Sequence, residues 1–97
     1  MKFAIYLHYK DNVATLLDEV CLGDLVIVKD LKGEDLVVLQ VEESMPHGYK
    51  IALQEIEAKT YLVKYGEIIG RANRLIRKGS MVHIHNLDSL RGGFKDV

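Results

Sequence analysis

Two histidines separated by a single residue are the side chains of this sequence best placed for chemistry. His83 and His85 follow the apolar residues Met81 and Val82. Alternate residues of a strand share one face, so a strand over 81–85 would point both imidazoles the same way. Two neutral imidazoles can hold a divalent metal if a third ligand comes from elsewhere. The alternative is that one histidine bonds to the backbone and the other is exposed, and the spacing alone favours this alternative.

His8 and Asp11 are a second candidate pair, three residues apart in an expected turn. Such a pair can share a metal or a hydrogen bond. Ordinary turn chemistry is the commoner outcome, because Asp11 and Asn12 can cap a turn by bonding to the local backbone. Lys50 follows a tight loop and could pair with a carboxylate, although such a lysine is more often solvated at a strand edge.

The elements that must position these residues are expected to be short strands. Runs of apolar and β-branched residues favour strands, and a glycine-containing segment at 32–35 indicates a hairpin. Two further segments, 12–20 and 71–78, have some helical period, and we interpret both as irregular or short. The expected strands lie at residues 3–7, 25–28, 36–41, 61–65 and 81–85.

One local pattern recurs along the chain: an apolar residue, then glycine three positions later, then an apolar residue three positions after that. It occurs at residues 20–26 and 76–82, and without glycine at 56–62. The pattern predicts a turn that buries its first residue, passes through a left-handed glycine and enters a strand. Lys59 would have to adopt that conformation at some cost, or the turn differs there.

Size and composition limit the function classes. The 97 residues fit one domain, and a single cysteine, Cys21, forms no internal disulfide, as in a reducing compartment. No apolar run approaches the roughly 20 residues of a membrane span. Residues 1–58 carry a net charge of −6 and residues 59–97 carry +5. The basic half could attract an anionic ligand or an acidic partner, whereas 7% aromatics without tryptophan argue against nucleic acid.

Four short motifs occur in order: His8-x-x-Asp11-Asn12-Val13-Ala14, Lys50-Ile51-Ala52-Leu53, Lys64-Tyr65-Gly66 and Val82-His83-Ile84-His85-Asn86. The ordered set covers most of the chain. It resembles the small SAF-type domain of altronate dehydratase, galactarate dehydratase and sulfolactate sulfo-lyase. Two positions depart from that family, because the histidine of its Gly-His-Lys motif falls at Tyr49 and another histidine that it often has falls at Met81.

The resemblance implies a mainly β fold, a single small β-clip domain with short turns and little helix. We expect this SAF-like domain to span residues 1–87 and a flexible tail to span 88–97. It also implies a function: the small subunit of a sugar-acid dehydratase, a carbon–oxygen lyase that acts with a separate large catalytic subunit in the cytoplasm. The alternatives are a free-standing, non-catalytic module that binds a small carboxylate or a protein, and a homo-oligomer that pairs its sheet edges.

The resemblance also implies roles for individual residues. A divalent metal, Fe²⁺ or Mn²⁺, would stabilise charge on the substrate in the assembled enzyme. The expected catalytic residues are His8, His85 and Asn86; the expected substrate-binding residues are Lys50, Lys64 and Arg71; and the expected metal ligands are Asp11, His83 and His85.

Overall fold

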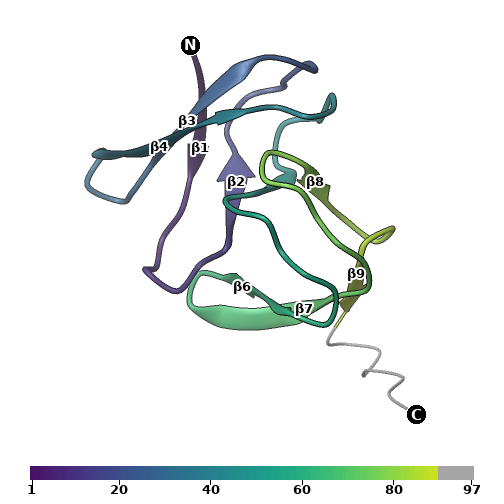
Figure 1. Ribbon diagram of the computed structural model, residues 1–97. Helices are drawn as coiled ribbons and strands as arrows, with labels where there is room; N and C mark the ends of the chain where they lie inside the picture. The colour runs from purple at the N-terminus through teal and green to yellow at the C-terminus, as the bar shows by residue number, and fades with distance from the viewer. Residues whose placement is uncertain (90–97) are drawn as a thin grey trace.

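Nine short strands form the part of the chain that the computed structural model describes, residues 1–89 (Figure 1). Within these residues there is no helix, and hence none long and apolar enough to cross a membrane. The expectation of a mainly β domain with little helix is therefore confirmed. The strands are β1 (Lys2–Ile5), β2 (Val13–Leu16), β3 (Leu25–Lys29), β4 (Asp35–Gln40), β5 (Lys50–Ala52), β6 (Tyr61–Lys64), β7 (Glu67–Ala72), β8 (Met81–Val82) and β9 (Leu87–Ser89).

The strands make two sheets. The larger has the order β4-β3-β1-β2-β5-β8, and the smaller has the order β6-β7-β9. All neighbours are antiparallel except β1 and β3, which are parallel. In Figure 1 β6 and β7 of the small sheet lie at the bottom, below β2, which is a middle strand of the large sheet. This places the middle of the large sheet where it can contribute side chains to both layers.

Alternation along β2 and β5 divides the interior into two cores. Ala14 and Ile51 point into the first core, inside the large sheet, while Val13 and Ala52 point into the second core, against the small sheet. Successive side chains of a strand face opposite sides, so two short strands serve both cores. The site residues on β2 and β5 therefore have fixed faces.

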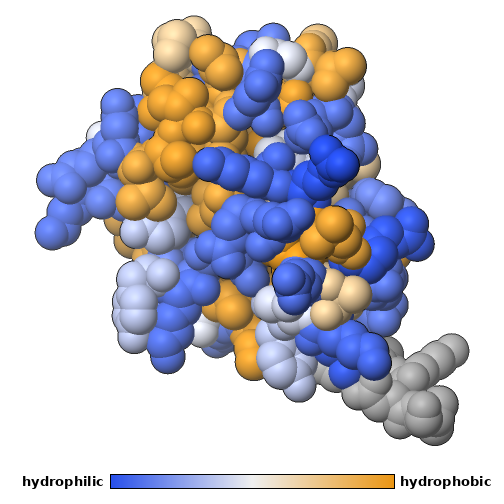
Figure 2. Space-filling model, viewed as in Figure 1, coloured by the Kyte–Doolittle hydropathy of each residue, from blue (hydrophilic) through white to orange (hydrophobic). Residues whose placement is uncertain are grey.

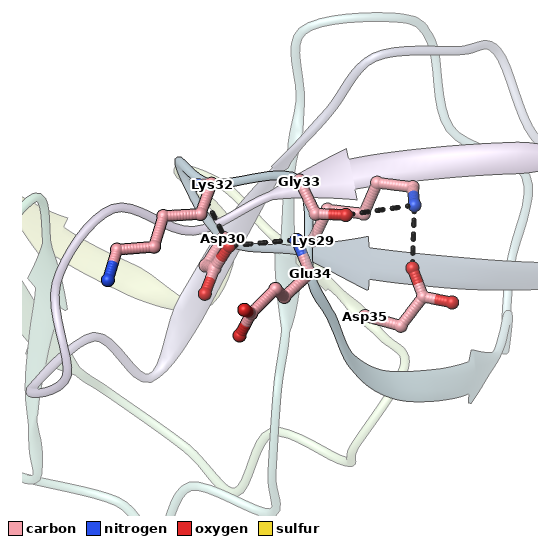
Figure 3. A network of polar contacts seen from close by, with 6 residues as sticks. All are labelled: Lys29, Asp30, Lys32, Gly33, Glu34 and Asp35. Atoms are coloured by element: carbon pink, nitrogen blue, oxygen red, sulfur yellow. Dashed lines mark hydrogen bonds and ion pairs between the residues drawn. The ribbon is translucent and has the colours of Figure 1, made fainter.

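A polar network closes the hairpin between β3 and β4 (Figure 3). One oxygen of Asp30 accepts the N–H groups of Lys32 and Glu34, at 2.9 and 3.0 Å. The ammonium of Lys29 lies 2.6 Å from a carboxylate oxygen of Asp35, which begins β4. Short carboxylate-to-backbone bonds of this kind stabilise turns, so the hairpin expected at 32–35 is confirmed.

Four copies of one turn connect the strands. Each copy starts at a buried residue in an isolated bridge, and Val20 bridges Met45 while Ile56 bridges Ile76. Three residues later each copy contains a residue with positive φ: Gly23 (89°), Gly48 (88°), Lys59 (72°) and Gly79 (86°). The three turns predicted from the recurring pattern are confirmed, Lys59 included. The fourth, at 45–51, was expected as a tight loop but not as a copy of this turn.

Hydrogen bonds within each pair of turns are crossed. The Gly23 N–H donates to the carbonyl of Val41, four residues before Met45, at 2.9 Å. The Gly48 N–H donates to the carbonyl of Leu16, four residues before Val20, also at 2.9 Å. The second pair repeats the exchange, from Lys59 to Ala72 and from Gly79 to Ala52. Each turn therefore satisfies backbone groups of its partner as well as its own.

Two of the sequence-based boundaries are corrected by the strand bounds. Residues 13–16 form β2, so the segment 12–20 is in part a regular strand and not irregular throughout. Asp88 and Ser89, which were expected to begin the tail, lie in β9 and pair with β7. Pairing with a neighbouring strand satisfies their backbone, which the polar sequence did not indicate. The remainder of the expected tail, 90–97, lies outside the described residues.

Candidate functional site

Two lysines meet where the two sheets join. Lys50 on β5 lies opposite Thr15 of β2 and Val82 of β8, on the face that packs toward the small sheet. Burial, and then the nearby charge of Lys64 at the end of β6, lower the pKa of Lys50 from its ordinary value of 10.5. Within residues 1–89 the salt bridge found is between Lys29 and Asp35, away from this site. No carboxylate of these residues forms a salt bridge with Lys50 or Lys64. The pair is thus a partly desolvated, uncompensated positive centre.

The turn between β6 and β7 presents a hydroxyl to this centre. Tyr65 and Gly66 both have positive φ, 57° and 78°, as in a type I′ hairpin. The Tyr65 hydroxyl lies 3.2 Å from the hydroxyl of Thr15, and the Lys64 ammonium lies 4.7 Å from the centre of the tyrosine ring. A non-glycine residue in this backbone conformation costs about 1–2 kcal/mol, so the turn holds Tyr65 in place against strain. We call Thr15, Lys50, Lys64 and Tyr65 the lysine cluster.

Asp11 ties the loop after β1 to the same turn. One of its carboxylate oxygens accepts the N–H groups of Leu7 and His8, each at 3.1 Å, and the other accepts the N–H of Gly66 at 2.8 Å. The side chain is buried. Three backbone donors use both oxygens, so Asp11 acts here as the connector between two loops.

His8 packs against the glycine of that turn. A Cβ on Gly66 would lie 2.9 Å from ring atoms of His8, so only glycine allows the imidazole this position. The Lys10 N–H donates to Nδ1 of His8 at 3.1 Å. A neutral His8 ring then carries its proton on Nε2. His8 also lines a pocket of about 490 Å³ together with Tyr6 and Leu31.

Asn12 joins the two sheets because its side chain makes hydrogen bonds to the backbone of β6, as a neighbouring strand would. Its side-chain oxygen accepts the Val63 N–H at 2.8 Å, and its amide donates to the carbonyl of Tyr61 at 2.9 Å. Sequence reasoning had assigned no role in the site to Asn12, Thr15 or Tyr65. Their partners lie about 50 positions away in the chain, and no local signal connects such distant residues.

The prediction that His83 and His85 share one face of a strand is wrong. β8 ends at Val82, and residues 83–86 form a turn. The physical reason is Asn86, which is buried: its side-chain oxygen accepts the His83 N–H at 2.9 Å and its amide donates to the Met81 carbonyl at 2.7 Å. These bonds close the turn. They also use the side-chain oxygen and amide of Asn86, the atoms through which it was expected to take part in catalysis.

The two imidazoles therefore have different surroundings. The ring of His83 stacks on Tyr49, with 4.8 Å between centroids. His85 is exposed and lines a pocket of about 260 Å³ with Arg74 and Arg77. Arg71 was expected to bind substrate, but it lies on β7 opposite Tyr61, at the far end of the hairpin from Lys64. Of the three expected substrate-binding residues, the fold brings Lys50 and Lys64 together.

The expected metal ligands do not form a set. Among residues 1–89 no three histidine, cysteine or acidic side chains are grouped so as to hold a metal ion. Asp11 already accepts three backbone N–H groups, His83 stacks on Tyr49, and His85 lies beside two arginines that repel cations. Residues 1–89 therefore do not fit a metal by themselves.

Comparison with known proteins agrees with this architecture. The family model for the altronate/galactarate dehydratase SAF domain matches residues 2–90. The chain is 37% identical over 91 residues to altronate dehydratase of Bacillus subtilis, covering 89% of this chain and 16% of that protein. It is 36% identical over 80 residues to galactarate dehydratase (L-threo-forming) of Escherichia coli, covering 82% and 14%.

A shorter relative is (2R)-sulfolactate sulfo-lyase subunit alpha of Chromohalobacter salexigens, 35% identical over 52 residues, which cover 54% of this chain and 55% of that subunit. The chain thus spans about one sixth of the length of the two dehydratases. The resemblance drawn from the four ordered motifs is confirmed. The chain belongs to the altronate/galactarate dehydratase SAF domain family.

Proposed function

We propose that this chain is the small component of a lyase that removes water from a sugar acid, acting with a separate large catalytic component in the cytoplasm. The observation that carries the proposal is the lysine cluster, an uncompensated positive centre beside two hydroxyls. Support comes from the relatives, because two of them are dehydratases and one is a lyase subunit. The exposed free thiol of Cys21 is compatible with a reducing compartment.

The lysine cluster suits the recognition of a substrate carboxylate. Ammonium groups bind carboxylates through charge-assisted hydrogen bonds, which are about twice as strong as neutral ones. In the elimination, a base removes the proton next to the carboxylate and negative charge develops on the carboxylate oxygens. The hydroxyl on the next carbon then takes up a proton and leaves as water, which forms the carbon–carbon double bond. Lys50 and Lys64 would stabilise that charge, and partial burial of Lys50 strengthens the effect because less water screens it.

His8 is the group of this chain best placed to move a proton. Its Nδ1 is bonded to the Lys10 N–H, so Nε2 is the nitrogen left to face a substrate. The proton of the neutral ring lies on Nε2, so His8 would act as an acid that donates this proton to the leaving hydroxyl of the substrate. Any metal of the assembled enzyme would be held mainly by the large component, since the donors here do not form a site.

A second candidate function is a free-standing module that binds a small carboxylate without catalysis. One observation favours it: all four residues of the lysine cluster come from this chain, so the proposed anion site would need no residue of a partner. Calorimetric titration of the chain alone with galactarate separates the two functions. Tight one-to-one binding without any gain in turnover on adding a large component would favour the module.

The main test removes the charge of Lys50 in the reconstituted enzyme. We expect Lys50→Met to lower kcat/KM for the sugar acid by about 10- to 100-fold, because one charge-assisted hydrogen bond to the substrate is lost. The affinity for the large component should not change. In the wild type, substrate affinity should fall as the pH rises through the lowered pKa of Lys50, below 10.5, because only the protonated amine binds an anion.

Lys78→Met is the matched control, since Lys78 is exposed in a turn outside the lysine cluster. It removes the same charge and should leave kcat/KM unchanged. Equal activity of the Lys50 variant and this control would contradict the role given to the lysine cluster. Failure of the wild-type chain to bind a large catalytic protein of this family from the same source would contradict the whole proposal.

A further inference from the structure

One face of the large sheet is covered over only half its width. Over β2 and β5, Val13 and Ala52 pack in the second core against the small sheet. The same face continues across β1, because Ile5 lies directly opposite Thr15 in the antiparallel register. Among the described strands the main contact between the two sheets is made by β2 and β6, so the small sheet lies against the β2 half of the face and leaves β1, β3 and β4 largely uncovered. The uncovered half needs a physical explanation.

The uncovered half is mainly apolar and includes one charged residue. Lys29 lies on the same face as Ile5, with its ammonium 5.3 Å from the centre of the Phe3 ring, and Phe3, Ile5 and Ile27 are half-buried. The pairing registers place side chains of three adjacent strands on it, and we call these five residues the bare face: Phe3, Ile5, Leu25, Ile27 and Val38. Leu25 and Val38 are 55% and 53% exposed. Figure 2 shows apolar side chains gathered at the upper left, where Figure 1 places β1, β3 and β4. Contiguous apolar surface of this kind marks an interaction site more often than a solvated face.

The adjoining sheet edge is also unprotected. β4 is the last strand of the large sheet, and its centre from Leu36 to Leu39 is entirely apolar. Natural edge strands usually carry lysine, proline or an inward charge to prevent pairing. β4 has none of these between Asp35 and Gln40. Its open backbone groups therefore add hydrogen-bonding capacity beside the bare face.

The bare face borders the lysine cluster. Ile5, at its margin, is the cross-strand neighbour of Thr15, whose hydroxyl lies 3.2 Å from that of Tyr65. A large protein bound to the bare face would therefore cover the solvent-exposed side of Lys50 and Lys64. Exclusion of water there would strengthen the electrostatic attraction between the two lysines and a bound anion.

We propose that the bare face, with the edge of β4, is the surface that binds the large catalytic component, an inference that rests on the proposed function. The matched region is only 16% and 14% of the two dehydratases, so each carries a far larger body beside this domain. A specific interface takes roughly 800 Å² from each partner, a modest share of the 6036 Å² of surface here. Residues 1–58, which contain all three strands, have a net charge of −6, so the partner's surface around this contact should be basic.

The test compares two substitutions of exposed β-branched residues to lysine. Val38→Lys places a charge on the bare face, and Ile68→Lys places one on β7 of the small sheet, where the side chain is 45% exposed. Calorimetry with the large catalytic protein of this family from the same source measures each affinity. We expect Val38→Lys to weaken binding at least about tenfold, as at a well-packed interface position, and Ile68→Lys to leave it unchanged. Leu25→Lys repeats the test at a second position, and thermal unfolding verifies that each variant is folded.

The outcomes distinguish the two proposals. Normal binding by both bare-face variants would overturn the assignment of the surface while leaving the proposed function intact. No binding by the wild type would overturn the proposed function, and the inference with it. Sedimentation of this chain alone gives the remaining outcome: a wild-type dimer that Val38→Lys converts to monomer, with unchanged affinity for the large component, would mean that a second copy covers the bare face.

Discussion

The two pairs of turns make the same hydrogen bonds with different residues. In the first pair both left-handed positions are glycines, Gly23 and Gly48, and a Cβ on either would meet nothing within 4 Å. In the second pair one position is Lys59 and the other is Gly79, where a Cβ would collide with the carbonyl oxygen of Gln40. The comparison teaches that the crossed hydrogen bonds define the turn. Glycine is required for space at one position of the four, and elsewhere it only relieves backbone strain.

The largest expected effect comes from Gly79→Ala. The new methyl group would collide with backbone and not with a mobile side chain, and the residue would keep a positive φ of 86°. We expect a loss of at least about 3 kcal/mol in the free energy of unfolding, from the collision added to left-handed strain. Urea unfolding followed by circular dichroism measures this loss. A loss below about 1 kcal/mol would show that the loop at Gln40 can move away.

Gly48→Ala is the matched change in the first pair. Its φ of 88° is almost that of Gly79, but open space surrounds the new methyl group. Strain alone should cost about 1–2 kcal/mol. The same unfolding experiment checks the value, and Gly23→Ala serves as a replicate. If both cost as much as Gly79→Ala, the distinction between space and strain drawn here is wrong.

The smallest effect, and one of opposite sign, is expected from Lys59→Gly. Lys59 has a φ of 72°, so glycine removes left-handed strain of about 1–2 kcal/mol but makes the unfolded chain more flexible by about 0.5–1 kcal/mol. The net result is a gain of roughly 0.5–1 kcal/mol, seen as a small rise in Tm. Lys78→Gly, at the turn position before Gly79, should produce no such gain.

The same turns show how much of the fold could be predicted from the sequence. The spacing of apolar residues and glycine located three of the four copies, and with them the strands that follow at β3, β6 and β8. The segment 45–51 has the same spacing, with Met45, Gly48 and Ile51, but it was predicted only as a tight loop before a strand and not as a further copy of the turn. β2 was missed because Thr15 and Leu16 continue a pattern that also suits a helix, and only pairing with β1 and β5 decides between the two.

The candidate site was less predictable because its contacts join residues far apart. Lys50 and Lys64 were predicted to bind substrate through family motifs, and the fold brings the two lysines together. Thr15 and Tyr65 complete the lysine cluster through a contact across 50 positions. The imidazoles of His83 and His85 were misplaced because a buried asparagine, Asn86, ends the strand. A polar residue that satisfies backbone groups competes with sheet pairing, and periodicity alone does not reveal which wins.

The crossed hydrogen bonds also have a kinetic consequence. Each left-handed residue donates to a strand end that belongs to the other turn of its pair, so neither turn is complete until both are present. The bridges join Val20 to Met45 and Ile56 to Ile76, and these loops must close before any of the bonds can form. Domains dominated by such non-local pairings fold in milliseconds to seconds. We expect one slow, all-or-none folding step, and a fragment that ends before Met45 should have no stable structure.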